Sequence, residues 1–185
     1  MTTSKSNSKS TPQNDIPNMY DPNSDLFDIA GLQEALNNSA NEPISNLTHA
    51  QIKRAKNDIL QKLQIKSDAL KTMHARLIGY RYIDNDGDGD VNDRVRVGEY
   101  VRWISLKRPD HLVLTNGAYV CNAYEMLNPS DPNSAYIRCK ISRGGGGSNS
   151  KFATRFFNLN MDENVIFQKI TYQEWIILDA LEHLK

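Results

Sequence analysis

The sequence lacks the patterns that announce several common classes of protein. Its two cysteines and four histidines are scattered, and the Cys-x-x-Cys and His-x-x-x-His spacings that indicate a zinc site do not occur. No apolar run reaches 18 residues, and the N-terminus shows no hydrophobic core of a signal peptide. We therefore expect a soluble, intracellular protein with no membrane span.

A net charge is also lacking, since 22 basic and 22 acidic side chains balance. The balance hides an uneven distribution. Residues 74–160 carry twelve basic and nine acidic side chains, and five of those nine acids lie in one loop at residues 84–93. Without that loop the segment would carry a charge of +8, which predicts a cationic surface inside a neutral total.

The acidic loop, Asp-Asn-Asp-Gly-Asp-Gly-Asp-Val-Asn-Asp, matches the first half of a calcium-binding loop. Alternate carboxylates followed by a glycine fit positions 1, 3, 5 and 6, but position 12 is Val95 where a bidentate Glu is needed. The loop is therefore either a solvated acidic turn or a weak calcium site with a Kd of roughly 10⁻⁴ to 10⁻³ M or poorer. The ligands of such a site would be Asp84, Asp86, Asp88, the backbone carbonyl of Asp90 and, through water, Asn92. We expect no other cofactor.

Composition and periodicity divide the chain into three parts. Residues 1–24 hold too few apolar groups to offset the entropy of ordering them, which predicts a disordered tail. Residues 25–79 show helical spacing of apolar side chains. Helices are expected after Ser24 or Asp25, after the capping box of Thr48 and Gln51, and after Ser67 and Asp68.

Residues 80–185 change to a period of two, which is typical of strands. Asn116-Gly117 between apolar runs predicts a tight hairpin, and Thr171 with Glu174 forms a capping box that starts a C-terminal helix. The fold class is thus α+β, with a small antiparallel SH3-like or OB-like β-barrel. The expected strands lie at residues 80–83, 95–104, 112–114, 119–121, 136–141, 152–159 and 165–170.

A hairpin centred on Ser130 would pair Cys121 with Cys139 on one apolar face. Two interpretations are open. The thiols could form a cross-strand disulfide or redox pair, or they could pack reduced as small hydrophobic groups.

Basic and aromatic residues interleave in the later strands, a combination with which small barrels bind single-stranded nucleic acid. The alternative is ordinary alternation, in which rings fill the core and the cations are solvated. The candidate nucleic-acid-binding residues are Arg94, Arg96, Arg102, Arg138, Lys140 and Arg155.

Three segments carry a resemblance to a known group of proteins: Val-Gly-Glu-Tyr-Val-Arg-Trp-Ile at 97–104, Leu-Thr-Asn-Gly-Ala-Tyr-Val-Cys at 114–121 and Met-Asp-Glu-Asn-Val-Ile-Phe-Gln-Lys at 161–169. Together with the closing helix they resemble an uncharacterised family of small proteins in large eukaryotic DNA viruses of the mimivirus and phycodnavirus kind. The resemblance covers residues 48–185 and involves structural motifs without catalytic residues. It implies a viral protein that works in the cytoplasm of an infected host cell or is packaged in a virion.

No Ser/His/Asp constellation can be assembled from the sequence, so we predict a protein that is not an enzyme and has no catalytic residues. The first hypothesis is an interaction or structural module, virion-associated in the viral setting, that binds a protein partner through its tail and helical faces. The second is a nucleic-acid-binding β-barrel. Salt-dependent binding to single strands would separate them. The sequence does not indicate an oligomeric state.

Overall fold

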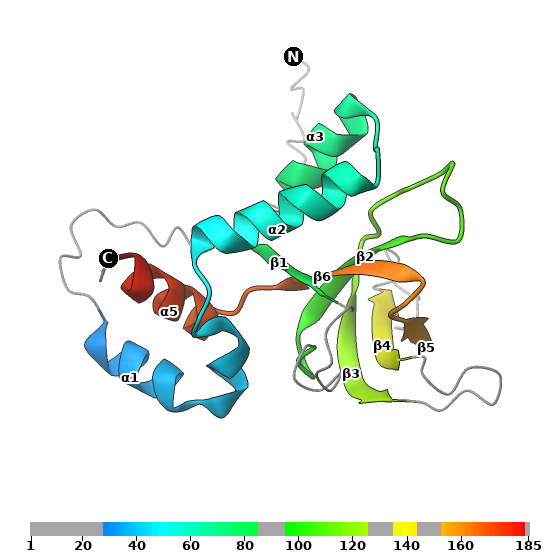
Figure 1. Cartoon of the computed structure of the whole chain (residues 1–185). Coiled ribbons are helices and arrows are strands. Elements are labelled where there is room, and N and C mark those ends of the chain that lie inside the picture. The colour runs from blue at the N-terminus through cyan, green and yellow to red at the C-terminus, as the bar shows by residue number, and fades with distance from the viewer. Residues whose placement is uncertain (1–27, 85–94, 126–134, 144–152, 184–185) are drawn as a thin grey trace, which may run out of the picture.

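The structure is a computed structural model that describes residues 28–84, 95–125, 135–143 and 153–183. Helices and strands occupy separate regions, with α1, η1 and α5 gathered beside the sheet and α2 and α3 lying across it (Figure 1). The helices are α1 (Ile29–Asn37), the 3₁₀ helix η1 (Ser39–Ile44), α2 (His49–Lys62), α3 (Ser67–Arg76) and α5 (Tyr172–His183). The strands are β1 (Tyr80–Ile83), β2 (Tyr100–Ser105), β3 (Ala118–Glu125), β4 (Ala135–Arg143), β5 (Ala153–Asn160) and β6 (Asn164–Lys169).

The six strands form one antiparallel sheet in the order β1-β6-β2-β3-β4-β5. The α+β class is confirmed, but the closed barrel is wrong, because β1 and β5 lie at opposite ends of the sheet. The sheet is nevertheless strongly curled. Trp103 on β2 and Phe157 on β5 are three strand spacings apart, about 14 Å in a flat sheet, yet their ring centroids are 5.6 Å apart.

Three apolar clusters stabilise this arrangement. The inner, concave face of the sheet buries residues such as Val101, Ile137 and Ile166. On the outer face, Leu60 of α2 and Leu77 pack against Phe167 of β6. A third cluster joins α1, η1, α2 and α5. Its buried members are Ala35, Ile44, Ile52, Ile170, Ile177 and Leu178.

Two of the expected helix starts are confirmed. Thr48 and Gln51 form a capping box at α2. At α5 the Thr171 backbone N–H donates to Glu174 Oε2 at 2.7 Å, and the Glu174 N–H donates to Thr171 Oγ1 at 3.1 Å.

The other two starts differ from the expectation. The α3 N-cap is Lys66 without a side-chain hydrogen bond, so Ser67 and Asp68 fall inside the helix. Asp28 caps α1 by accepting from the Gly31 N–H at 2.8 Å, later in the chain than the predicted caps, which lie outside the described residues.

The predicted Asn116-Gly117 hairpin is also wrong. Leu114 makes an isolated bridge to Ile104, and β3 pairs instead with β2, Tyr119 opposite Tyr100. Gly117 has a φ of +103°, and a Cβ there would lie 2.5 Å from Tyr100 Cε1. Glycine is therefore needed where β3 begins its approach to β2.

The β3–β4 hairpin follows the predicted register only in part. Ala123 lies opposite Ile137 as expected, but the register shifts between Val120 and Asn122, so Cys139 pairs with Val120. Cys121 occupies the irregular position. Both thiols are free, as in the second interpretation given above.

Candidate nucleic-acid interface

The acidic loop lies at the boundary of the described residues. Asp84 ends the described part of the first strand region, and Asp86, Asp88, Asp90 and Asn92 lie outside the described residues. Within the part of the chain that the structure describes, no cluster of three or more His, Cys, Asp or Glu side chains could hold a metal ion. The weak calcium site stays a prediction.

Arg96, one of the candidate nucleic-acid residues, makes polar contacts with other residues of the protein. Its Nη1 lies 3.3 Å from Glu174 Oε1 and donates to Asn41 Oδ1 at 2.9 Å, while its backbone N–H donates to Gln168 Oε1 at 2.9 Å. The side chain joins the sheet to α5 and η1. Arg94, another candidate, lies outside the described residues.

A second arginine shares the same carboxylate. Arg81 Nε lies 3.8 Å from Glu174 Oε1, and the Glu174 side chain is only 2% exposed. Burial lowers the pKa of Arg81, and the nearby Glu174 charge opposes that effect. Sequence reasoning identified Glu174 only as a capping residue, because nothing local signals its ion pairs.

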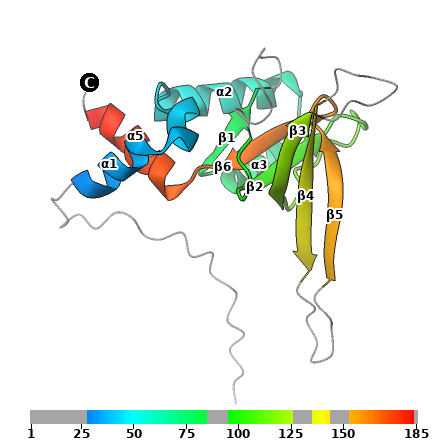
Figure 2. The same cartoon turned by 90° about the horizontal axis from the view of Figure 1, so that it is seen from below.

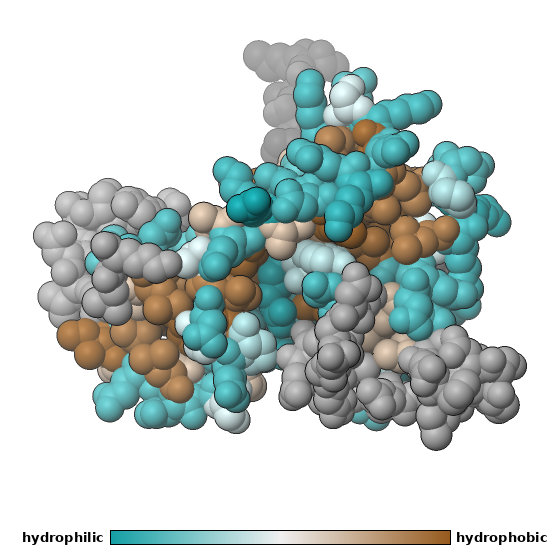
Figure 3. Space-filling model, viewed as in Figure 1, coloured by the Kyte–Doolittle hydropathy of each residue, from teal (hydrophilic) through white to brown (hydrophobic). Residues whose placement is uncertain are grey.

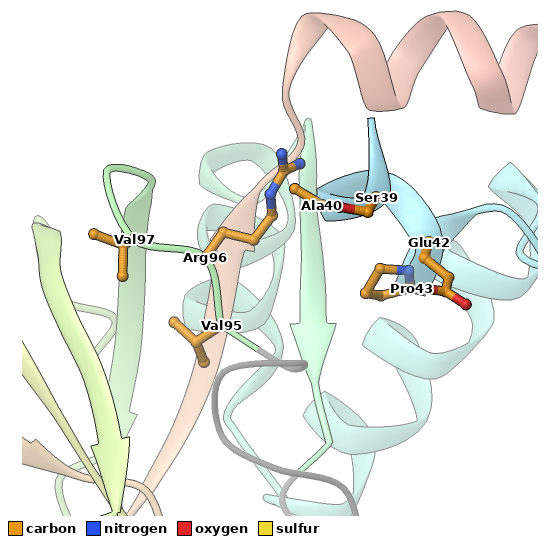
Figure 4. A pocket seen from close by; sticks show the side chains of 7 residues that line it. All are labelled: Ser39, Ala40, Glu42, Pro43, Val95, Arg96 and Val97. Atoms are coloured by element: carbon orange, nitrogen blue, oxygen red, sulfur yellow. The ribbon is translucent and has the colours of Figure 1, made fainter. Parts of the chain in front are cut away.

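A pocket of about 650 Å³ opens beside Arg96, between η1 and the segment before β2. Figure 4 shows the Arg96 side chain reaching toward η1 and the chain that enters α5. Among the described residues that line the pocket, the charged ones are Arg96 and Glu42, one of each sign. Its lining residues are Ser39, Ala40, Glu42, Pro43, Val95, Arg96 and Val97.

The outer face of the sheet carries a different arrangement. Cross-strand pairing places Tyr100 opposite Tyr119, Tyr119 opposite Lys140, and Lys140 opposite Phe156. Directly opposite residues share a face, so these four side chains form one row across β2, β3, β4 and β5. We call this row the aromatic row. Tyr119 is 47% exposed and Phe156 is 52% exposed.

The rings and cations of this face contact one another. Tyr100 and Tyr119 meet edge to face with centroids 4.8 Å apart. The Arg138 guanidinium lies over the Phe156 ring at 5.5 Å, and Arg102 lies over the Tyr80 ring at 5.1 Å. The cations are thus held beside the rings.

A shallow cleft of about 570 Å³ runs along the β2 and β3 side of the row. Its lining includes the cations Arg102, Lys140 and Lys169 and one acid, Glu99. Burial raises the pKa of Glu99, and the Arg96 charge opposes the rise. The described lining is therefore net cationic.

Three of the six candidate residues share this outer face: Arg102, Arg138 and Lys140. Arg155 alternates to the other face, opposite Ile141. Sequence reasoning missed Tyr100, Tyr119 and Lys169. Period-two alternation placed Tyr100 beside Arg102, but the position of Tyr119 next to Tyr100 depends on strand pairing, which local sequence does not encode.

A comparison with protein families, curated proteins and solved structures finds no match for the chain. No helix among the described residues is long and apolar enough to cross a membrane. The function is therefore inferred from the geometry of the chain itself.

Proposed function

We propose that the protein is a non-enzymatic module that binds single-stranded nucleic acid on the outer face of β3, β4 and β5. The observation that carries the proposal is the aromatic row, in which Lys140 stands between the half-exposed rings of Tyr119 and Phe156. Bases stack on such rings, and neighbouring cations contact the phosphates.

The spacing of the row suits an extended single strand. Tyr119 and Phe156 lie on strands two apart, so their Cβ atoms are separated by about 10 Å. That distance accommodates bases on both rings with a phosphate near Lys140. Arg138, over the Phe156 ring, supplies a second cation.

The face is also suited to unpaired bases in particular. A ring can stack only on a base that has left its own stack, and the bases of an intact duplex are already stacked on one another. Every base has a stacking surface, and we therefore expect little sequence preference.

Fluorescence anisotropy with a labelled 20-nucleotide oligothymidylate tests the proposal. We expect Tyr119→Ala and Phe156→Ala each to weaken binding by about thirtyfold, the middle of the range of roughly 1–3 kcal/mol per stacked base, and Phe156→Tyr to bind like the unaltered protein. Lys140→Ala should reduce the salt slope of log K by about 0.7, the value for one phosphate contact on a single strand.

The matched control is Lys53→Ala, which removes an exposed cation from α2. It should leave the affinity and the salt slope as they are. Duplex binding as tight as single-strand binding, or equal loss from the Lys53 and Lys140 variants, would contradict the proposal.

A second candidate is the protein-binding module of the first sequence hypothesis. Ile29 and Leu36 lie seven positions apart on one side of α1 and are 73% and 58% exposed, and an apolar surface covers this helix in Figure 3. Such patches mark interaction sites. The viral resemblance adds an infected cell or a virion as the setting. A photo-cross-linking residue at position 36 should yield a discrete adduct in cells, and one at position 53 should not.

A further inference from the structure

The two edges of the sheet are built differently. β1 is four residues long and α2 packs on it, with Lys56 Nζ donating to the Leu77 and Tyr80 carbonyls. β5 is eight residues long and pairs with β4 through all eight without a register shift. Figure 2 shows β5 at the rim of the sheet.

β5 has few of the devices that protect edge strands. Natural edges are blunted by shortness, proline, bulges, a covering segment or charges, including charges that point inward. The strand reads Ala-Thr-Arg-Phe-Phe-Asn-Leu-Asn, with Arg155, on the inner side, as its one charge and no proline. Such an edge is a template for another strand.

The hydrogen bonds of β5 show which backbone groups face outward. The Met161 N–H donates to the Ala135 carbonyl at 2.9 Å, so in the alternating antiparallel ladder the odd-numbered residues of β5 bond to β4. The backbone N–H and C=O groups of Thr154 and Phe156 therefore point away from β4, toward the rim.

We propose that β5 pairs antiparallel with β5 of a second copy of this chain, about a two-fold axis at Phe156. Directly opposite residues in such a pair share a face, so their numbers must sum to an even value. Only two such registers pair nearly the whole strand. In one the residue numbers sum to 312 and Phe156 lies on the axis, and in the other they sum to 314 and Phe157 lies on the axis.

The turn after β5 distinguishes the two registers. A sum of 314 needs Asn160 as a pairing residue, but its carbonyl already accepts from Asn164 Nδ2 at 2.7 Å. A sum of 312 places Phe156 opposite itself and Thr154 opposite Asn158, within the outward-facing set. This register is therefore the one that the backbone supports.

The side chains favour a second copy as the occupant. In this register Phe156 meets Phe156 of the other copy, an aromatic pair across the axis. On the inner side Arg155 faces Phe157 of the other copy, a cation beside a ring. An isologous contact of this kind closes as a dimer and leaves no further free β5 edge.

The contact is a single ladder, so we expect a weak dimer. It falls below the roughly 1,200 Å² of a standard stable interface, so the dimer should form only at high protein concentration. The pairing does not rest on the proposed nucleic-acid binding and is measured without nucleic acid. If both hold, two aromatic rows become continuous across the axis.

Sedimentation velocity of the full chain from 5 to 500 μM tests the pairing. The unaltered 21.0 kDa chain should shift toward twice that mass as concentration rises. In the doubly substituted chain Thr154→Lys with Asn158→Lys, like charges oppose each other across the axis, and we expect at least tenfold weaker dimerisation.

The matched variant, Thr154→Lys with Asn158→Asp, puts opposite charges at the same pairs and should dimerise at least as tightly as the unaltered chain. Position 158 also lies opposite Arg138 of the same chain, so both variants are measured again with Arg138→Ala, where the difference between them reports the contact between copies. A monomer at 500 μM would overturn the proposal, as would a dimer that both variants leave unchanged or both abolish. A chain that stays monomeric yet captures an extended peptide on β5 would also overturn it.

Discussion

The outer face of the sheet has a covered half and an open half. Over β1, β6 and β2, α2 and α3 bury it, and Phe167 is fully inaccessible. Over β3, β4 and β5 the same face exposes half of Phe156. Both rings sit on period-two strands of one sheet, yet one is buried in the core and the other is half exposed.

The difference lies in chain connectivity. α2 and α3 lead directly into β1, so they can reach only the strands near that edge. Arg102 marks the boundary, since its Nη1 donates to the Arg76 carbonyl at the end of α3 while its guanidinium lies over Tyr80. An aromatic side chain on a strand of this sheet is therefore buried or exposed according to what the preceding helices cover.

The largest expected difference comes from replacing each of the two rings with alanine in turn. Phe167→Ala should lower the free energy of unfolding by about 3–5 kcal/mol, because it leaves a cavity beneath α2. Phe156→Ala should cost less than about 1 kcal/mol. Urea denaturation followed by circular dichroism measures both, and equal losses would remove the distinction between the halves.

The second test concerns how α5 is held against the sheet. Glu174→Gln should lower the free energy of unfolding by about 3 kcal/mol, since Arg81 and Arg96 lose their shared buried carboxylate. Thermal denaturation measures the loss. Glu163→Gln, in the exposed pair with Lys107, is the control and should leave the midpoint where it is.

The third test is at the boundary between the halves. Gly117→Ala forces a Cβ against Tyr100 and the Val101 carbonyl at a positive φ, so we expect a loss of about 1–3 kcal/mol. Because Tyr100 must move, edge-to-face packing with Tyr119 should also change. Near-ultraviolet circular dichroism of the tyrosines reports the change in packing. The comparison is Gly98→Ala, where the φ is also positive but the added Cβ meets open space.

The smallest expected effect tests whether water is excluded from the inner face of β4, beneath the open half of the outer face. Burial, and then the charge of Cys121, raises the pKa of the Cys139 thiol from 9.0 to about 12. The folded state then holds a proton that the unfolded state releases, so stability is complete below pH 9 and falls as the pH rises toward 12.

Denaturation midpoints between pH 8 and pH 11 measure this decline. Cys139→Ala should make it shallower, whatever the baseline cost of the cavity, and Cys121→Ala, which removes only the second and smaller cause of the raised pKa, should change it less. An unchanged slope in the Cys139 variant would mean that water reaches the inner face of β4.

Sequence signals predicted what is local. The capping boxes at Thr48 and Thr171 were correct because each is complete within four residues, and β1 begins and ends at the predicted Tyr80 and Ile83. The predicted hairpin through Leu114 failed because neighbouring segments were assumed to pair with each other, whereas Leu114 and β3 both pair with β2.

The candidate interface was predictable only in composition. Alternation indicated that Arg138 and Lys140 share a face, and the structure agrees. It could not show that Tyr119 lies between Tyr100 and Lys140, since the irregularity at Cys121 shifts the register by one residue. Nor could it show that Arg96 turns inward to Glu174.

The carboxylate of Glu174 performs two tasks at once. Its Oε2 accepts from the backbone N–H of Thr171, just before α5, and its Oε1 faces two arginines of the sheet region. Initiation of the helix and docking of the helix therefore share one side chain. The first-turn amides of α5 should exchange with deuterium only through global unfolding, whereas helix ends ordinarily fray.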